Sequence, residues 1–513
     1  MICVSIGRTR HKYMIAELQH LAQQGVPLVE LRLDYLGRSV DLSRLLRDRR
    51  CKVLVTVRRR EDGGRWQKSE QERLMLLRNA IASGVEYVDL EGDIAGSIPR
   101  YGATKRIVSH HDFVRTPENL ADLHRHLASQ EADVVKIATM ALGVNDNLRM
   151  MELARTATVP TIAICMGELG TPTRILAGRM GAPFSFATAS SERRLAPGQL
   201  EWKEMHDVYR YDTITPKTKL FGVIADPVGH SYSPLIHNAA MAAQGLDARY
   251  LPFQVPREDL RTFIHACEGM GIRGLSVTIP HKEAALDLMT QAEAAASSIG
   301  AINTILFDGP RRLGYNTDYR AAMECIEGEF GKISEQVDEQ PWRGKSALIL
   351  GAGGVARGIG WGLYQKGAEV FFTSRTLMRA HGLADSIGGT PVPWDRREEL
   401  KVDMLVNCTP VGMHPDLDNT PISADALHRD TVVFETIYNP EQTLLIKNAR
   451  RVGCRTISGV EMFVRQAAYQ YRLFTGQEPP LELMRQTLKL ATNPVRLNVR
   501  RDDELGHSDE PFS

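Results

Sequence analysis

The chain has 513 residues, 43% hydrophobic and 24% charged, which is typical of a globular protein with about three or four domains. Its formal net charge of +1 gives no reason to expect nucleic acid or an anionic membrane surface as a partner, and no apolar run approaches the ~20 residues of a membrane span. The 7 cysteines form no C-x-x-C pair, so we expect no bound metal and no disulfide framework, and a cytoplasmic location fits them.

The first part of the chain, roughly 210 residues, alternates β-rich runs with helical periodicity. Strands are predicted at residues 2–6, 28–33, 53–57, 87–90, 106–109, 134–138, 161–165 and 184–187. Helices are predicted in most gaps, for instance at 11–24, 70–83, 117–129 and 145–156. This alternation implies parallel pairing, and about eight such units in this length predict a (β/α)8 barrel. An open doubly wound sheet is the alternative, but no Gly-rich phosphate turn follows any of these strands.

Polar residues gather at the predicted strand ends, where active sites of such barrels lie. The candidates are Glu30, Arg32, Asp34, Arg58, Asp62, Glu91, His111, Lys136 and, in the loop after the last strand, Gln199. A structural ion pair is the alternative for Glu30 and Arg32, and a satisfied histidine is the alternative for His111.

Lys136 is the most informative of these residues because it lies inside the apolar run 134–138. An ammonium taken out of water loses hydration, and its pKa falls unless it is paired. A neutral lysine amine forms Schiff bases with carbonyl substrates. The alternative is a lysine that snorkels from a strand edge.

Together these residues suggest a Schiff-base enzyme. An iminium on Lys136 would acidify the adjacent C–H, and a histidine could remove that proton and return one to a leaving hydroxyl. An arginine would hold a substrate carboxylate in a bidentate pair. This chemistry fits dehydration of a β-hydroxy ketone, or alternatively an aldol cleavage.

The motifs in this part resemble type I 3-dehydroquinate dehydratase over about residues 1–210. They are Thr56-Val57-Arg58 with Gly63-Gly64, Ser109-x-His111-Asp112-Phe113, Val135-Lys136-Ile137-Ala138 and Ala196-Pro197-Gly198-Gln199. The resemblance implies Lys136 as the Schiff-base lysine and His111 as the general acid/base. It also implies substrate contacts from Arg58, Arg174 and Gln199, with Glu30 and Arg32 lining the site, and gives no role to His110.

Two positions depart from that family's pattern. Asp62 stands where a glutamate usually orients the histidine, so the carboxylate reaches one methylene less far. Leu195 replaces a serine before Ala-Pro-Gly-Gln, so one contact to a substrate hydroxyl is missing or comes from elsewhere.

A break near residues 211–217 separates a second part, and the polar stretch 331–342 divides that part again. After it, an apolar strand at 346–350 runs into Gly351-Ala352-Gly353-Gly354-Val355, a turn suited to a pyrophosphate at a helix N-terminus. About twenty residues on, where an acid would bind the ribose of NAD, the chain has Ser374-Arg375-Thr376. We therefore expect NADP, with an exposed loop arginine as the alternative reading of Arg375.

Upstream of this turn lies a possible substrate lobe. Lys282 and Asp318 could shuttle the proton that accompanies hydride transfer to a ketone, or form a surface salt bridge. Ser231 and Ser233 precede a predicted helix and could bind substrate or cap that helix.

These runs resemble shikimate dehydrogenase over about residues 218–480. The matching motifs are Ser231-x-Ser233-Pro234, Val277-Thr278-x-Pro280-x-Lys282, Asn303-Thr304, Asn316-Thr317-Asp318, Asn407-x-Thr409-Pro410 and Gln466-Ala467. The resemblance implies Lys282 and Asp318 as the catalytic pair. It implies that the substrate is held by Ser231, Ser233, Thr278, Asn303 and Gln466. It implies that the cofactor is held by Gly351, Ala352, Gly353, Gly354, Val355, Ser374, Arg375 and Thr376. Ser276, Ser374 and Ala321 depart from common family residues, but none of them removes a proposed catalytic group.

The two resemblances predict a fused enzyme of the shikimate pathway that acts on small molecules. We expect a barrel at 1–212, a substrate lobe at 217–325, a Rossmann NADP-binding lobe at 340–465, returning helices at 466–490 and a polar tail at 491–513. The alternatives are a catabolic, NAD-linked quinate or shikimate dehydrogenase half, and a ligand-sensing regulator that has lost its acid–base groups. The oligomeric state is open at this point.

Overall fold

The computed structural model of the chain describes residues 1–330 and 342–492. Its contacts form two compact units, the first holding Met1–Ser231 with Asp247–Gly271 and the second holding Tyr232–Leu246 with the described residues from Ile272 onward. The predicted break at 331–342 lies outside the described residues except for Trp342, and so does most of the predicted tail. Within the described ranges, every helix falls short of the length and apolarity that a bilayer crossing requires.

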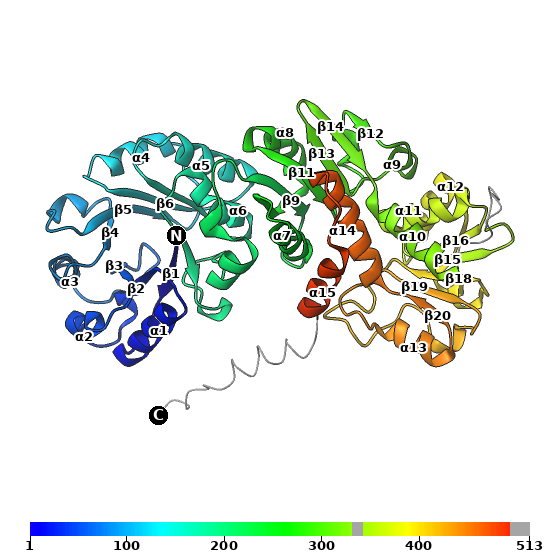
Figure 1. Cartoon of the computed structure of the whole chain (residues 1–513), viewed down its shortest axis with the longest axis horizontal. Coiled ribbons are helices and arrows are strands. Elements are labelled where there is room, and N and C mark those ends of the chain that lie inside the picture. Colours follow the sequence, from blue (N-terminus) through cyan, green and yellow to red (C-terminus); the bar gives the residue numbers. More distant parts are fainter. Residues whose placement is uncertain (331–341, 493–513) are drawn as a thin grey trace. The chain divides into compact units, whose positions relative to one another are not determined.

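An eight-stranded parallel sheet is the centre of the first unit, in the order β7-β6-β5-β4-β3-β2-β1-β8. The strands are β1 (Ile2–Ile6), β2 (Leu28–Arg32), β3 (Lys52–Thr56), β4 (Tyr87–Glu91), β5 (Lys105–Asp112), β6 (Val134–Met140), β7 (Thr161–Met166) and β8 (Ser185–Thr188). The helices are α1 (His11–Gln23), α2 (Leu42–Leu46), α3 (Glu70–Ala82), α4 (Leu120–Ala128), α5 (Val144–Thr156) and α6 (Thr171–Ile175). These helices surround the curled sheet, and the structure confirms the predicted (β/α)8 barrel (Figure 1).

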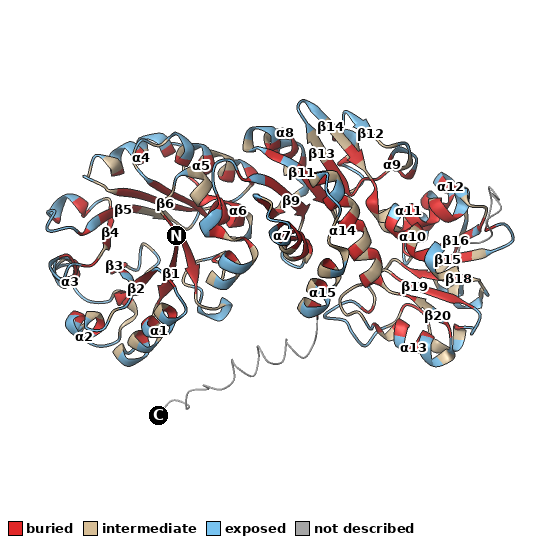
Figure 2. Ribbon diagram, in the orientation of Figure 1, coloured by how far each residue is buried: buried red, intermediate tan, exposed pale blue. Residues whose placement is uncertain are grey.

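Because side chains alternate between the two faces of each strand, the barrel interior contains an apolar layer and a polar layer. Cys3, Leu28 and Leu54 belong to a buried apolar cluster with Tyr87 and Val134. Successive side chains of a strand point to opposite faces, so residues two positions further along share the interior face. Those residues include Glu30, Asp89 and Lys136, whose positions toward the strand ends prepare the site. The strands are accordingly buried along most of their length, while the helices expose their outer faces (Figure 2).

Strand β5 is longer than the sequence predicted. It was expected over 106–109 but continues through His110 and His111 to Asp112, which pairs with Thr139 of β6. These polar residues continue to pair with β6 because the interior of the barrel is itself polar at the C-terminal ends of the strands. His111 therefore sits on a rigid strand and not in a loop.

The first unit also contains β9 (Lys219–Ala225) and β10 (Ala248–Gln254), which pair in parallel, and α8 (Leu260–Met270). The second unit contains the mixed strands β11 (Ile272–Val277), β13 (Thr304–Asp308), β14 (Arg311–Tyr315) and β12 (Gln291–Ala292). Around them it places α7 (Ser233–Ala243), α9 (Ala294–Ile299), α10 (Thr317–Phe330), α14 (Gly459–Thr475) and α15 (Leu481–Thr492).

A six-stranded parallel sheet in the order β17-β16-β15-β18-β19-β20 completes the second unit. Its elements are β15 (Ser346–Leu350), α11 (Gly354–Gln365), β16 (Glu369–Thr373), α12 (Leu377–Ile387), β17 (Thr390–Val392), β18 (Met404–Asn407), β19 (Val432–Glu435), α13 (Leu444–Val452) and β20 (Arg455–Ile457). This strand order is that of a Rossmann fold, and it confirms this part of the predicted fold class.

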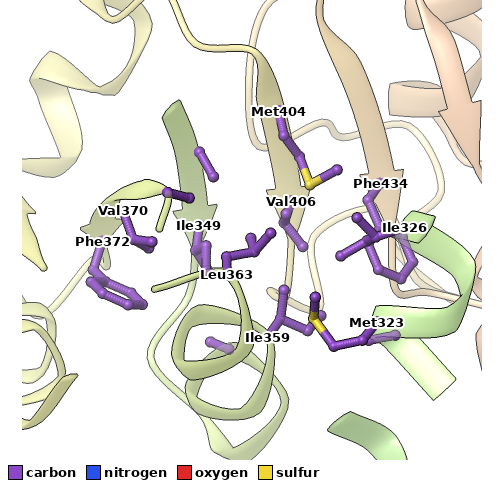
Figure 3. Packing of buried hydrophobic residues seen from close by; sticks show 14 of the residues in the cluster. Met323, Ile326, Ile349, Ile359, Leu363, Val370, Phe372, Met404, Val406 and Phe434 are labelled. Carbon is purple, nitrogen blue, oxygen red and sulfur yellow. The ribbon is translucent and has the colours of Figure 1, made fainter. Parts of the chain in front are cut away.

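Apolar side chains on one face of this sheet pack against α10 and α11. Ile349 and Phe372 extend from β15 and β16 toward Ile359 and Leu363 of α11 (Figure 3). The close approach of the helix fixes the Gly-rich turn between β15 and α11, where a cofactor is expected.

Candidate functional site

One cavity at the C-terminal ends of the barrel strands brings together most of the site residues predicted for the first part, whereas Asp34 and Glu91 do not line it but pair with Arg32 and Arg58. It is lined by Glu30, Arg32, Arg58, Asp62, His111, Lys136, Arg174 and Gln199. Phe113, Phe186 and Leu195 add apolar walls.

Lys136 reaches this cavity from β6 with 7% of its surface exposed. Its Nζ lies 3.0 Å from Asp89 Oδ2 and 4.1 Å from the centroid of the Phe186 ring. The lysine is therefore neither snorkelling nor unpaired, because it is held in the cavity by a carboxylate.

Asp89 is the residue that sequence reasoning missed. It lies on β4 and accepts hydrogen bonds from Ser109 Oγ at 2.5 Å and from Lys136, and it pairs with Arg58 Nη2 at 2.8 Å. Burial opposes its ionisation, but the charges of Arg58 and Lys136 hold the pKa of Asp89 well below its usual range. The available signal was the alternation Asp89-x-Glu91, which places both acids on the interior face with Tyr87.

The three arginines of the cavity differ in their partners. Arg32 forms two hydrogen bonds with Asp34, at 2.9 and 2.8 Å. Arg58, expected to contact substrate, already pairs with Asp89 and with Glu91 at 3.0 Å. The suggested Glu30–Arg32 ion pair is wrong, since Glu30 accepts hydrogen bonds from Ser5 at 2.5 Å and Thr56 at 2.7 Å.

Arg174 differs from both because no carboxylate among the described residues pairs with it. The residue is 2% exposed, its Nη2 donates to the carbonyl of Pro197 at 3.0 Å, and its Nε is buried without a partner in the described structure. Burial lowers the pKa of Arg174 to about 10. A buried cation without a counterion is a place where an anionic ligand is strongly favoured.

His111 lies in the cavity as a neutral ring. Burial, then the charges of Arg58 and Lys136, lower its pKa well below the ordinary value. Its Nδ1 is buried and accepts or donates no hydrogen bond within the described residues. Asp62, predicted to orient it, is bound instead by Arg59 Nε at 2.7 Å, and Arg59 also holds Asp93 at 2.7 and 3.1 Å.

Gln199 closes the cavity from the loop after β8. Its amide donates to the carbonyl of Ala187 at 3.2 Å, and its Oε1 accepts the N–H of Leu195 at 3.0 Å. These bonds fix the loop in which Leu195 presents an apolar side chain to the cavity.

In the second unit, Lys282 Nζ lies 2.6 Å from Asp318 Oδ2, in the first turn of α10. The side chains are only 14% and 13% exposed, so the alternative of a solvated surface salt bridge is wrong. The carbonyl of Lys282 accepts the N–H of Ile302 at 2.9 Å, which places the lysine next to Asn303.

Asn303 links the other predicted contacts of this unit. Its Oδ1 accepts the N–H of Thr317, next to Asp318, at 2.8 Å, and its carbonyl accepts the N–H of Val277, next to Thr278, at 2.7 Å. Gln470 of α14, which sequence reasoning missed, donates to the carbonyl of Asn303 at 3.1 Å. It lies one helical turn after Gln466, and this i, i+4 spacing was the signal.

The two predicted serines lie at the start of α7. Ser233 is buried and is the first residue of the helix, whereas Tyr232 is the N-cap residue and forms no side-chain cap. Ser231 is the last residue of this stretch in the first unit. Neither serine is therefore the N-cap residue of α7, which the helix-capping alternative would require.

The Gly-rich turn after β15 has room for a dinucleotide phosphate. Gly351 has a φ of 110°, and a Cβ there would lie 2.8 Å from the carbonyl oxygen of Cys408, so only glycine fits. Gly353 is the N-cap residue of α11 and provides no side-chain cap, which leaves first-turn N–H groups for an anion. Ala352 lies in this turn, and Val355 is the second residue of α11.

The Lys282–Asp318 pair and this turn adjoin each other. A Cβ at Gly354 would lie 3.1 Å from Lys282 Cδ. Ser374, Arg375 and Thr376 follow β16, and the side chain of Arg375 is exposed. Arg379, in the first turn of α12, is a second exposed cation that sequence reasoning did not single out.

Comparisons with known proteins agree with this geometry. Residues 2–216 match the model of type I 3-dehydroquinase, residues 223–305 that of the shikimate dehydrogenase substrate binding domain, and residues 459–489 that of the shikimate 5'-dehydrogenase C-terminal domain.

Relatives match both halves. A chloroplastic bifunctional 3-dehydroquinate dehydratase/shikimate dehydrogenase of Arabidopsis thaliana is 36% identical over 504 residues, covering 94% of this chain and 83% of the relative. A shikimate dehydrogenase (NADP(+)) of Methanothermobacter thermautotrophicus is 37% identical over 290 residues, 55% of this chain and 99% of the relative. A crystal structure of shikimate dehydrogenase in complex with NADP+ matches with a TM-score of 0.51 and 35% identity, over 55% of this chain and 98% of that one.

Proposed function

The chain belongs to the bifunctional 3-dehydroquinate dehydratase/shikimate dehydrogenase family, a lyase joined to an NADP-dependent oxidoreductase of the shikimate pathway, and from this premise we propose how its own residues carry the two reactions. The barrel removes water from 3-dehydroquinate to give 3-dehydroshikimate. The second half reduces 3-dehydroshikimate to shikimate with NADPH.

Lys136 is the nucleophile of the dehydration. The ammonium of Lys136 passes one proton to His111, and the amine adds to the substrate ketone. His111 returns that proton to the carbinolamine hydroxyl, which leaves as water, so the iminium keeps the single positive charge beside Asp89. The iminium acidifies the neighbouring C–H, and neutral His111 accepts that proton. His111 then returns a proton to the departing hydroxyl, and hydrolysis of the iminium releases the enone and restores the lysine.

Arg174 is the group that holds the substrate carboxylate. The observation that carries this assignment is its buried guanidinium, which has no counterion among the described residues, whereas Arg32 and Arg58 each pair with acids. A bidentate carboxylate–guanidinium pair would satisfy the buried Nε. Glu30, Gln199 and the paired arginines shape the remaining polar walls.

Lys282 and Asp318 manage the proton of the reduction. When bound, NADPH supplies the hydride. Lys282 donates a proton to the oxygen of the substrate ketone, and Asp318, 2.6 Å away, keeps the lysine in position for the transfer. Asn303 and Thr278 lie beside this pair and would hold substrate hydroxyls, together with Ser231, Ser233 and Gln466.

Arg375 selects the phosphorylated cofactor. Its exposed guanidinium at the end of β16 is free to pair with the 2'-phosphate, which NADH lacks. We expect Arg375→Ala to raise the KM for NADPH by at least about ten-fold while the KM for NADH changes little. Equal rates with NADH and NADPH in the unaltered chain would favour the catabolic, NAD-linked alternative.

Reductive trapping tests the dehydratase assignment. Borohydride added with 3-dehydroquinate should attach the substrate carbons to the peptide that carries Lys136, as seen by mass spectrometry. Lys105→Ala, an exposed lysine on the neighbouring strand, is the matched control and should trap normally. Turnover without any trapped adduct would reject the Schiff-base route, and binding without turnover would favour the ligand-sensing alternative. The cytoplasmic location stays a prediction that cell fractionation tests.

A further inference from the structure

The segment Asp247–Gly271 belongs by sequence to the dehydrogenase half, yet its contacts place it in the same compact unit as the barrel. It contains β10, a 3-10 turn at Arg257–Asp259 and α8. Helix α8 packs against α5, and β10 packs against α6 and against the 3-10 turn Glu168–Gly170. The segment therefore supports the barrel elements that directly follow β6 and β7.

Helix α5 has no capping side chain of its own. Its N-cap residue is Gly143, and the N–H of Val144 donates to Asp259 Oδ2 at 2.9 Å. A Cβ at Gly143 would lie 3.0 Å from the same oxygen, so glycine leaves space for the incoming carboxylate. A carboxylate here satisfies an orphan N–H donor and interacts favourably with the helix dipole.

The cap is connected to the substrate cavity by one further hydrogen bond and by the backbone of α6. One turn into α5, Asn147 Nδ2 donates to the carbonyl of Leu169 at 2.7 Å. Leu169 lies in the turn that leads into α6, and α6 carries Arg174. A contiguous path thus runs from Asp259 through α5 to the buried guanidinium.

We propose that Asp259 is a positioning residue for the dehydratase, which fixes α5 and through Asn147 sets the orientation of Arg174 toward the substrate carboxylate. A side chain encoded in the dehydrogenase half thereby supports substrate binding in the barrel. The proposal rests on the assignment of Arg174 as the carboxylate-binding group. Because that contact exists in both the bound substrate and the transition state, disturbing it should change KM more than kcat.

The test uses the full-length chain with Asp259→Ala, Asp259→Asn and the neighbouring exposed control Glu258→Ala. Asp259→Ala should raise the KM for 3-dehydroquinate roughly three- to ten-fold with kcat nearly unchanged. Hydrogen exchange at the Val144 amide should accelerate about five-fold in the same variant. Asp259→Asn keeps a capping oxygen and should restore both values, and Glu258→Ala should match the unaltered chain.

Two further variants separate the possible failures. Asn147→Ala removes the next link and should reproduce the KM effect even if Asp259→Ala does not fold, and the two changes should combine non-additively. A normal KM in Asp259→Ala, or additive effects in the double variant, would overturn the proposal. Arg174→Ala should raise the KM further than either variant; if it does not, the carboxylate assignment fails, and the positioning role fails with it.

Discussion

Asp89 shows how one buried carboxylate organises the dehydratase cavity at the scale of single residues. It neutralises Arg58 and Lys136 at once and remains ionised, because their charges outweigh the cost of its burial. When Lys136 becomes an iminium, the positive charge stays beside the same oxygen. Asp89 therefore stabilises both the resting lysine and the covalent intermediate.

We expect Asp89→Asn to cripple dehydration and to weaken the fold. Removing one partner of a buried ion pair leaves uncompensated charge, at a cost of about 3–5 kcal/mol in the free energy of unfolding. Urea unfolding and the dehydratase kcat measure the two effects. Asp122→Asn, at an exposed position on α4, is the control and should change neither value. Unaltered kcat in Asp89→Asn would show that the iminium does not depend on this charge.

The depressed pKa of His111 sets the pH dependence of dehydration. Burial and the charges of Arg58 and Lys136 keep the ring neutral well below pH 6.5, so it remains a competent base there. The kcat/KM for 3-dehydroquinate, which reports the free enzyme, should show no loss with a midpoint near 6.5. Replacing His110, its neighbour on β5, with alanine should leave the profile unchanged. An acidic limb centred near 6.5 would contradict a buried, neutral His111.

At the scale of elements, strand alternation made most of the barrel predictable. Apolar runs flanked by helical periodicity gave all eight strands, and a charge inside one such run identified Lys136. The partner Asp89 was not found because its pairing with Lys136 depends on β4 and β6 lying on either side of β5 in the same sheet. The extension of β5 was also missed, since polar residues at a strand end resemble a loop until the neighbouring strand is known.

Contacts between elements that are far apart in the sequence could not be predicted from sequence patterns. Nothing in the sequence around Val144 indicates that its helix is capped by Asp259, 115 residues further along the chain. Likewise, Arg174 and Arg58 look alike in sequence, and only the structure shows that one is paired and the other is not.

Strand β19 ends in a buried acid that should make the dehydrogenase half sensitive to pH. Glu435 accepts hydrogen bonds from Asn407 at 3.0 Å, Thr443 at 2.8 Å and the N–H of Ile437 at 3.1 Å. Burial nevertheless raises its pKa to about 7 from 4.5. The folded state therefore binds the proton more tightly, and this stabilisation is complete below pH 4.5 and lost as the pH rises through 7.

We expect Glu435→Gln to remove this dependence. The difference in unfolding free energy between the unaltered chain and the variant should change by up to about 3 kcal/mol from pH 4.5 to pH 8. Urea unfolding at several pH values, followed by a probe in the second unit, measures this difference. Glu369→Gln, at the exposed start of β16, should show no such trend. A pH-independent difference for Glu435→Gln would mean that this carboxyl is ionised throughout the range.

At the scale of the whole molecule, the two sets of proposed catalytic groups lie in separate compact units. Lys136, His111 and Asp89 belong to the first, and Lys282 and Asp318 belong to the second. Each lysine is held by a carboxylate of its own unit. Loss of one lysine should therefore leave the other site intact.

This separation predicts that two inactive chains complement each other. Lys136→Ala should abolish dehydration yet reduce added 3-dehydroshikimate normally. Lys282→Ala should dehydrate normally and reduce at least about a hundred-fold more slowly, because the proton donor is gone. An equimolar mixture should convert 3-dehydroquinate and NADPH to shikimate after a lag, as the intermediate accumulates and reaches the second chain through solution.

NADPH consumption and the absorbance of the enone follow the two steps, and Lys12→Ala, an exposed change on α1, should behave as the unaltered chain. If Lys136→Ala also slowed the reduction of added 3-dehydroshikimate, the two sites would not be independent. The pairing of each lysine with a carboxylate of its own unit would then not account for the two activities.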